Sequence, residues 1–463
     1  MKYGLSEKQL KEIKDILASY PEVEEAVLFG SRAIDTYKEA SDVDIAVRGK
    51  KVNWSLAAKI KDHLEEETYL PFFFDIIAYN TIKSDELKKH INTKGKTIYS
   101  RKKSVWKVCE LGEVAQLEKG SWKVGDEELP YIALEHIVEG GLRLQGIGDS
   151  NTIASNKYRF NSDCFLFGKL RPYFRKLYRP GFEGICSTDI WVVKPKGEND
   201  KDFLFYFFAN QEFVDFTYSG SSGTRMPRAD WEFVSKSKWN FAHPIEQKAI
   251  AEVLSSLDDK IDLLHRQNKT LEAMAETLFR QWFIEEAKED WEEEKLGCFL
   301  QPQKGRNITK SEAIDGEYPV VAGGLEPSCY HNKSNTKAPV ITVSASGANA
   351  GFIRLYNTPV WSSDSSFIDK TITSFIFTFY IFLKISQDLL FDKQEGSAQP
   401  HVYPSHIMDL DILKYPESIL IKFEDLIRPY FGKIKINQNQ IYTLEKLRDT
   451  LLPKLMSGEV RVE

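Results

Sequence analysis

The chain has 463 residues, more than one hydrophobic core usually serves, so roughly two to four domains are expected. The net charge of −6 argues against a protein that coats nucleic acid without selectivity, but it leaves room for a site-specific reader. The longest apolar run, residues 375–383, is too short to span a bilayer, and the polar, amphipathic stretch 2–14 leads us to expect no signal peptide. Five scattered cysteines without a CxxC pair indicate a reducing cytoplasm.

Residues 1–96 are expected to form a small α/β domain. Ser6 and Gln9 form a capping-box pattern ahead of a first helix, which Pro21 ends. Further along, the pattern predicts strands at 26–29, 42–47 and 72–79 and helices at 57–64 and 85–91. The basic segment 97–104 is expected to be a linker.

Three acidic residues of this first domain are candidates for a metal site. Asp42 and Asp44 alternate along a predicted strand, which directs both carboxylates to one face, and Asp75 lies on a neighbouring predicted strand. Converging carboxylates repel one another unless a hard cation such as Mg²⁺ neutralises them. The structural alternative for Asp42 and Asp44 is two surface acids beside a turn.

A Gly-Ser-Arg turn precedes these acids. Gly30 allows close backbone approach to a triphosphate, Ser31 begins a helix whose first amides point at anions, and Arg32 is the third candidate nucleotide-binding residue. The chemistry implied is nucleotidyl transfer at a paired-metal site. The turn, the Asp-x-Asp pair and the later Asp resemble the minimal nucleotidyltransferases of the DNA polymerase β superfamily. The resemblance implies that the three aspartates are catalytic metal ligands, with Mg²⁺ and a nucleoside triphosphate as cofactors.

Beyond the linker the sequence repeats itself. The stretch 244–283, in the predicted central helix 244–286, recurs as 416–456, in the predicted C-terminal helix 416–463. A constant offset of 173 pairs Lys260 with Lys433 and Gln267 with Gln440. Apolar residues recur in both stretches at steps of three and four, which predicts two long helices packed on each other as a spacer. The alternative is two unrelated amphipathic helices, each packed on its own domain.

The repeat extends upstream of the helices into two predicted domains, residues 105–243 and 287–415. Residues 223–227 (GTRMP) lie at the same offset from residues 396–400 (GSAQP). Ser187-Thr188-Asp189 likewise resembles Ser362-Ser363-Asp364. A domain followed by a helix therefore occurs twice.

Residues 104–463 resemble the specificity subunit of a type I restriction-modification system. The stretches that carry the resemblance are residues 130–132 (PYI), 168–173 (GKLRPY), 186–190 (CSTDI), 244–247 (PIEQ) and the terminal LRDTLLPKLMSGEV. It implies an α+β multidomain chain: a small α/β nucleotidyltransferase domain, then two α/β target-recognition domains separated by two long antiparallel coiled-coil helices. The implied partners are double-stranded DNA, methyltransferase (M) subunits and a restriction (R) subunit, with no membrane and no cofactor for this region.

Polar side chains on loops are the candidates for DNA contact, because bidentate Arg, Asn and Gln read base edges whereas phosphates take Lys and backbone amides. The candidates are Lys169, Arg171, Tyr173, Arg175, Arg225 and Arg228 in the first recognition domain, and Ser346, Asn349, Gln399 and His401 in the second. Because the two sets differ, we expect an asymmetric bipartite target whose spacing the helices set.

Residues 104–463 lack the signatures of amine methylation and of ATP-driven translocation, so this region is expected to be non-catalytic by itself. The leading hypothesis is a DNA sequence-specificity subunit with an accessory or regulatory nucleotidyltransferase domain. The rival is an adenylyltransferase-like enzyme whose remaining chain only recruits it to a partner protein or nucleic acid. Site-specific DNA binding with and without the first domain discriminates between them.

Overall fold

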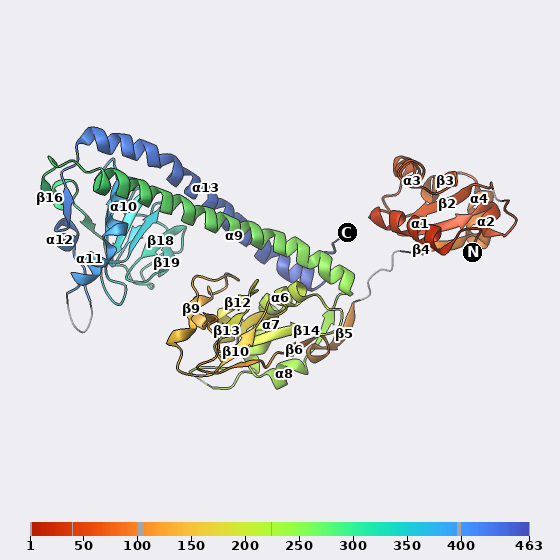
Figure 1. Ribbon diagram of the computed structural model, residues 1–463, viewed down its shortest axis with the longest axis horizontal. Coiled ribbons are helices and arrows are strands. Elements are labelled where there is room, and N and C mark those ends of the chain that lie inside the picture. Colours follow the sequence, from red (N-terminus) through yellow and green to blue (C-terminus); the bar gives the residue numbers. More distant parts are fainter. Residues whose placement is uncertain (1, 39, 101–105, 224, 396–399, 463) are drawn as a thin grey trace. The chain divides into compact units, whose positions relative to one another are not determined.

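The computed structural model describes residues 2–38, 40–100, 106–223, 225–395 and 400–462. The chain divides into two compact units (Figure 1). One comprises residues 1–253 and 452–463, and the other comprises residues 254–451. Each unit has hydrophobic clusters of its own.

The N-terminal domain is a four-stranded sheet in the order β3-β2-β1-β4 with helices packed on it. Its elements are α1 (Glu7–Ser19), β1 (Glu25–Phe29), α2 (Gly30–Ala33), β2 (Val43–Arg48), α3 (Trp54–Glu66), β3 (Phe74–Ala78), α4 (Asp85–Lys94) and β4 (Lys96–Ser100). Strands β2 and β3 are parallel, whereas β1 is antiparallel to both β2 and β4. The predicted capping box is confirmed, because the Gln9 N–H donates to Ser6 Oγ at 3.2 Å and the Ser6 N–H to Gln9 Oε1 at 2.9 Å.

The structure corrects the expected linker. Residues 97–100 belong to β4, which pairs with β1, and Ile98 is buried in the core of the domain. The apolar, β-branched and aromatic side chains of Thr97, Ile98 and Tyr99 suit a strand, and their pairing outweighs the basic composition of the segment. Residues 101–104 lie outside the described residues.

Residues 106–243 form a five-stranded sheet (β7-β10-β13-β8-β9), a four-stranded sheet (β12-β11-β14-β6) and a β5-β15 ladder. The strands are β5 (Lys107–Glu110), β6 (Ala115–Leu117), β7 (Ser121–Trp122), β8 (Pro130–Ile132), β9 (Gly148–Asp149), β10 (Lys157–Phe160), β11 (Phe165–Gly168), β12 (Leu177–Tyr178), β13 (Gly184–Cys186), β14 (Ile190–Pro195) and β15 (Lys238–Phe241). The helices are α5 (Leu111–Val114), α6 (Lys201–Ala209), α7 (Gln211–Ser219) and α8 (Trp231–Ser235). Aromatic packing joins α6 to β11, with the rings of Phe208 and Phe165 5.0 Å apart.

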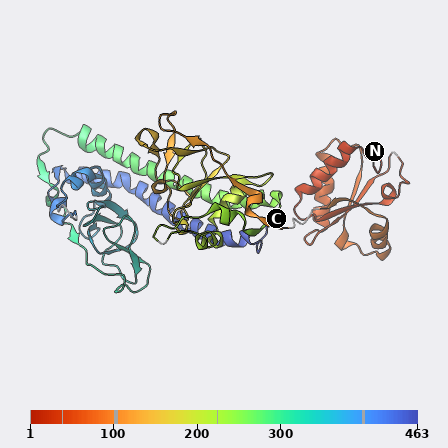
Figure 2. The same ribbon diagram turned by 90° about the horizontal axis from the view of Figure 1, so that it is seen from below.

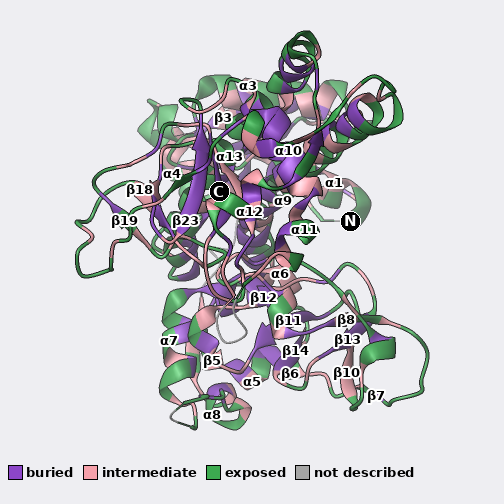
Figure 3. Ribbon diagram, turned by 90° about the vertical axis from the view of Figure 1, so that its left-hand side faces the viewer, coloured by how far each residue is buried: buried purple, intermediate pink, exposed green. Residues whose placement is uncertain are grey.

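Residues 287–415 form a four-stranded sheet (β17-β23-β20-β21), a three-stranded sheet (β19-β18-β22) and a β16-β24 ladder. The strands are β16 (Glu293–Lys295), β17 (Gln303–Lys304), β18 (Tyr318–Val321), β19 (Cys329–His331), β20 (Val340–Ser344), β21 (Ile353–Tyr356), β22 (Trp361–Ser362), β23 (Ser365–Asp369) and β24 (Asp411–Leu413). The helices are α10 (Ile376–Ile385), α11 (Gln387–Asp392) and α12 (Pro404–Met408). Every residue of α10 from Ile376 to Leu383 is buried (Figure 3), as expected for a helix that is apolar on all sides.

The two predicted long helices are α9 (Pro244–Arg280), which continues into a π-helical turn at Gln281–Glu285, and α13 (Glu417–Met456). Within residues 254–451 they run side by side (Figures 1 and 2). Ile261 packs in one cluster with Ile441, and the ring of Phe279 contacts that of Phe423 at 5.8 Å. From the first pair to the second, the residue number increases in α9 and decreases in α13, so the two helices are antiparallel. The prediction that they pack on each other is confirmed.

Candidate functional site

Sheet register brings the three predicted aspartates of the N-terminal domain to one face. Asp44 in β2 is the register partner of Phe29 in β1 and of Asp75 in β3. Asp42 lies one residue before β2 and is two residues from Asp44, so side-chain alternation directs both toward that face. Asp42 and Asp75 are exposed, whereas Asp44 is half-buried.

The turn between β1 and α2 closes over Asp44. Gly30 has a φ of +67°, a conformation that side chains other than that of glycine rarely adopt. A Cβ atom there would also lie 2.1 Å from Oδ2 of Asp44. The glycine is therefore required by the carboxylate that rests against it, and Ser31 follows, half-buried, in α2.

Negative charge accumulates at this face. Burial raises the pKa of Asp44, and the charges of Asp75 and Asp42 raise it further, while Arg32 opposes the shift. Carboxylate oxygens that repel one another in this way are a donor set suited to Mg²⁺. Among the described residues, however, no three His, Cys, Asp or Glu side chains are already gathered as a metal-binding group. The chemistry of the residues fits the metal, although the side chains do not form a closed cage.

Arg32 differs from the prediction of a nucleotide contact. Its side chain is buried, and all three guanidinium nitrogens donate to backbone carbonyls, those of Tyr3, Ser41 and Asp42, at 2.7 to 3.2 Å. The guanidinium also lies 4.8 Å from the ring centre of Phe72. Arg32 therefore holds the segment that carries Asp42 in place, and its donors point into the domain.

The loops predicted to meet DNA have the same backbone connections in both recognition domains. The Lys169 N–H donates to the carbonyl of Asp189 at 2.9 Å, and the Ala345 N–H donates to that of Asp364 at 3.1 Å. The next residue in each loop then forms an isolated β-bridge. These bridges are Leu170 with Arg228 in the first domain and Ser346 with His401 in the second. The structure thus places Arg228 and His401 at equivalent positions.

The same loops share two left-handed backbone positions. Arg171 and Arg175 have φ values of +51° and +47°, and Gly347 and Gly351 have +81° and +89°. In each domain the second position comes four residues after the first. Holding a side chain other than that of glycine in this region costs roughly 1–2 kcal/mol. The first domain therefore has arginine at both left-handed positions, whereas the second has glycine, the residue that this backbone conformation favours.

The predicted DNA-contact residues of the first domain differ in accessibility. Arg225 is exposed, and so is Tyr173, whose ring meets that of Tyr218 edge-on at 5.3 Å. Lys169 and Arg171 are half-buried. Arg175 is half-buried as well, and its Nη2 donates to the carbonyl of Gly140 at 3.0 Å.

In the second domain, Ser346, Asn349 and His401 are all half-buried. Asn349 Nδ2 donates to the carbonyl of Gly323 at 3.3 Å. The ring of His401 stacks on Tyr403, with centroids 6.0 Å apart and planes at 14°. Gln399 lies outside the described residues.

Two carboxylates that sequence reasoning did not assign to the site hold these loops. Arg228 Nε donates to Oδ1 of Asp189 at 2.9 Å and its Nη2 to Oδ2 at 3.3 Å. In the second domain the Ser346 hydroxyl donates to Oδ2 of Asp364. The available signal was the repeated Ser-Thr-Asp and Ser-Ser-Asp motif, whose last residue is the anchoring aspartate in each case.

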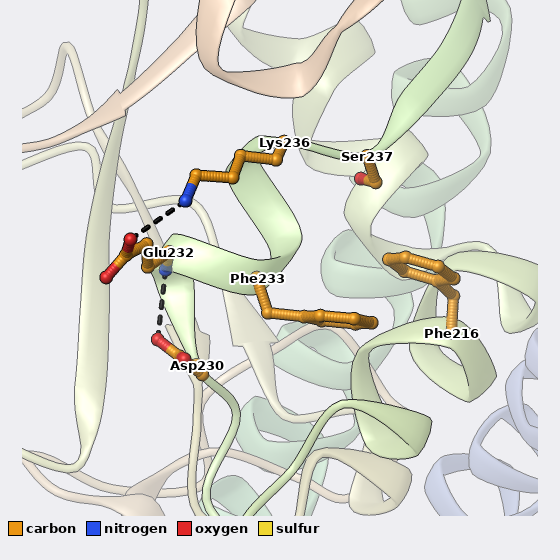
Figure 4. Close-up of a pocket in the computed structure, with 6 residues that line it drawn as sticks. All are labelled: Phe216, Asp230, Glu232, Phe233, Lys236 and Ser237. Carbon is orange, nitrogen blue, oxygen red and sulfur yellow. Dashed lines mark hydrogen bonds and ion pairs between the residues drawn. The ribbon is translucent and has the colours of Figure 1, made fainter.

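A hollow of about 440 Å³ lies beside α8 in the first recognition domain (Figure 4). Its lining residues are Phe216, Asp230, Glu232, Phe233, Lys236 and Ser237. The rings of Phe216 and Phe233 stack 5.1 Å apart, and Lys236 pairs with Glu232 at 2.8 Å. None of the predicted site residues lines it.

Comparison with known proteins agrees with this division of the chain. Residues 11–104 match the family described as polymerase beta nucleotidyltransferase, and residues 103–273 match the type I restriction modification DNA specificity domain. The MjaIX type I restriction enzyme specificity subunit of Methanocaldococcus jannaschii is 27% identical over 309 residues, which are 58% of this chain and 72% of that protein. A Mycoplasma pneumoniae protein named as a type I specificity subunit is 26% identical over 65% of this chain and 82% of its own length.

Among solved structures, the type I restriction-modification S subunit of M. genitalium aligns over 77% of this chain and 97% of its own, with 16% identity and a TM-score of 0.49. The family matches and the sequence relatives define the chain as a two-part protein, in which a nucleotidyltransferase domain precedes a DNA specificity region. Residues 103–273 thus carry a type I restriction-modification DNA specificity domain, and residues 11–104 carry a polymerase beta nucleotidyltransferase domain. Among the described residues, no helix combines the length and the apolar composition needed to cross a membrane.

Proposed function

We propose that residues 106–463 read a bipartite, asymmetric DNA site. The observation that carries the proposal is the pair of equivalent loops, which share backbone bridges at Arg228 and His401 but present different side chains. A common loop framework with different polar groups suits two domains that read different half-sites. The candidate contact residues are those named from the sequence, with Arg225, Arg228 and Tyr173 the most exposed of the first domain.

The antiparallel helices are proposed to set the distance between the half-sites and to dock methyltransferase and restriction subunits. Exposed apolar side chains on α9 and α13, among them Leu263, Met274, Ile436 and Tyr442, are available for such partners. DNA binding and the docking of these subunits would take place in the cytoplasm, where the target DNA lies.

A test is to map modified bases in host DNA when the full chain is expressed with the methyltransferase subunits of its system. We expect one bipartite motif with two unequal halves. Modification at a single continuous motif, or at none, would contradict the proposal. The same mapping with the variant Arg225→Ala provides a second test. If Arg225 reads a base, selectivity should be lost in one half of the site only.

We further propose that the N-terminal domain transfers a nucleoside monophosphate and plays an accessory or regulatory role. Asp42, Asp44 and Asp75 would hold Mg²⁺, which would neutralise the triphosphate and polarise its α-phosphoryl group. Gly30 and Ser31 would form the turn beside the phosphates, and Arg32 would keep Asp42 in register from within the domain. The pairing of Asp44 with Asp75 in the register of β2 and β3, with Asp42 two residues before Asp44, supports this assignment.

The double variant Asp42→Asn with Asp44→Asn tests the transfer. Amides cannot neutralise divalent cations, so transfer of labelled nucleoside monophosphate should be lost while the modified DNA motif stays unchanged. Retained transfer would refute the catalytic assignment. A changed DNA motif in a folded variant would instead show that the two regions do not work independently.

A further inference from the structure

Arg228 holds Asp189 through one edge of its guanidinium. The donors are Nε and Nη2, which reach Oδ1 and Oδ2 at 2.9 and 3.3 Å. The other edge of the guanidinium carries Nη1 together with the second hydrogen of Nη2, and these donors point away from the carboxylate. A guanine in the major groove offers O6 and N7 side by side, which fit a donor pair of this kind.

The backbone of Arg228 is held as firmly as its side chain. The Arg228 N–H donates to the carbonyl of Ser222 at 2.9 Å, and the Ser222 N–H donates back at 3.1 Å. The bridge to Leu170 fixes Arg228 from the other side. The side chain is 47% exposed even so, and that of Asp189 is 27% exposed. Arg228 is therefore oriented in advance and remains open to a ligand, which lowers the ordering cost of binding.

The second recognition domain uses the same framework differently. His401 occupies the position equivalent to Arg228, and its ring stacks on Tyr403. Asp364, the counterpart of Asp189, accepts a hydrogen bond from the Ser346 hydroxyl. The carboxylate is thus present in both domains, but it supports an arginine only in the first.

We propose that Arg228 reads one guanine of the first half-site and that Asp189 is the positioning residue that presents it. This proposal rests on the proposed DNA-reading function and adds to it a base and a residue pair. The test distinguishes this proposal from two simpler roles. In the first, Arg228 contacts only phosphate, and in the second, Asp189 only repels DNA.

The test is selection from a randomised duplex library by the full chain together with its methyltransferase subunits, followed by sequencing. The variants are Arg228→Ala, Arg228→Lys and Asp189→Asn, with His401→Ala as the matched change in the other domain. We expect Arg228→Ala to lower the preference for guanine at one position by roughly 5- to 150-fold and to leave the other positions unchanged. Arg228→Lys should keep the overall affinity but weaken that preference, because lysine lacks the planar fork. Asp189→Asn should weaken the same preference, whereas His401→Ala should alter only the other half-site.

Each alternative gives a different pattern. A uniform loss over all sequences in Arg228→Ala would show a phosphate contact and overturn the proposal. Tighter binding to all sequences in Asp189→Asn, with the base preferences unchanged, would show that Asp189 only repels DNA. If the unsubstituted protein enriches no site, the proposed function itself fails. If it enriches a bipartite site that Arg228→Ala leaves unchanged, only this inference fails.

Discussion

Arg448 in α13 donates from Nη1 to Oδ1 of Asp258 in α9 at 2.8 Å, across 190 residues of sequence. Their side chains are only 3% and 11% exposed. Arg448 also binds Asp449 through Nε at 3.1 Å. A buried ion pair is weak evidence for stability, since burial costs each ion much of its hydration. In paired helices, however, a buried polar contact favours one register over others.

We predict that Arg448→Met loosens the helix pair, because it removes the guanidinium that pairs with the buried carboxylate of Asp258. The expected loss is about 3–5 kcal/mol, and replacing both residues with apolar ones should recover much of it. Hydrogen exchange of α13 peptides in the full chain measures the change locally. The control is Lys446→Met, two residues away and exposed, which should have little effect. Equal protection in Arg448→Met and the control would contradict a role for the pair.

A second buried contact lies further along the same helices. Asn437 Nδ2 donates to Oδ1 of Asn268 at 2.9 Å and to Oε1 of Gln267 at 3.4 Å. Four residues inserted in α9 alone would displace this contact. Matched insertions in both helices, after Gln267 and after Asn437, should preserve the pairing and lengthen the helices by about 6 Å.

The matched insertion should therefore lengthen the gap between half-sites by about two base pairs, given a rise of about 3.4 Å per base pair. Mapping of modified bases in host DNA measures the gap directly. Both half-site sequences should be unchanged, and the insertion in α9 alone should impair assembly. A gap that stays the same after the matched insertion would show that the helices do not set the distance.

Local periodicity made part of this architecture predictable. The apolar steps of three and four identified α9 and α13, and the alternation of Asp42 with Asp44 placed both acids on one face. Both inferences depend only on neighbours in the sequence. The residues that face one another across the helices, such as Asp258 and Arg448, depend on the register of two distant segments, which periodicity alone does not fix.

The recognition loops show why the equivalent positions of the two domains could not all be predicted from the sequence. The offset that aligns the long helices pairs Arg228 with His401, but the loop after β11 aligns with the loop after β20 only when shifted by a few residues. The counterpart of Arg171 is Gly347, and the two share a left-handed φ without sharing chemistry. Arg32 was misassigned for a related reason, since its acceptors come from residues 3, 41 and 42, which the turn motif does not contain.

For the first recognition domain we predict that Arg225→Ala weakens specific DNA binding by about 1–3 kcal/mol and relaxes only one half of the site. Its side chain is exposed in the loop that Arg171 contacts through the carbonyl of Arg225. Competition binding with duplexes altered in one half-site at a time measures the effect. Met226→Ala, at the exposed neighbouring position, is the control. A loss shared by all sequences would identify Arg225 as a phosphate contact.

Asp44→Asn should separate stability from activity in the N-terminal domain. Burial, with the charges of Asp75 and Asp42, raises the pKa of Asp44 in the folded protein above its ordinary value. Between the ordinary and the raised pKa the folded state binds more protons than the unfolded state. Without metal, the free energy of unfolding therefore falls as the pH rises through this window, and the ionised carboxylate destabilises the domain at neutral pH.

Asparagine has no charge to bury, so without metal the variant should unfold at a higher temperature than the natural chain at neutral pH. In acid, where Asp44 is protonated, the difference between the two unfolding temperatures should be smaller. Mg²⁺ should raise the unfolding temperature of the natural chain and leave the variant unchanged, because binding to the folded state alone stabilises it. Nucleotidyl transfer should be lost in the variant. Calorimetry of the N-terminal transition in the full chain measures both effects, with the exposed Asp15→Asn as control. A variant that is less stable at neutral pH would show that the charge of Asp44 does not destabilise the domain, and one that still gains stability from Mg²⁺ would show that Asp44 is not a metal ligand.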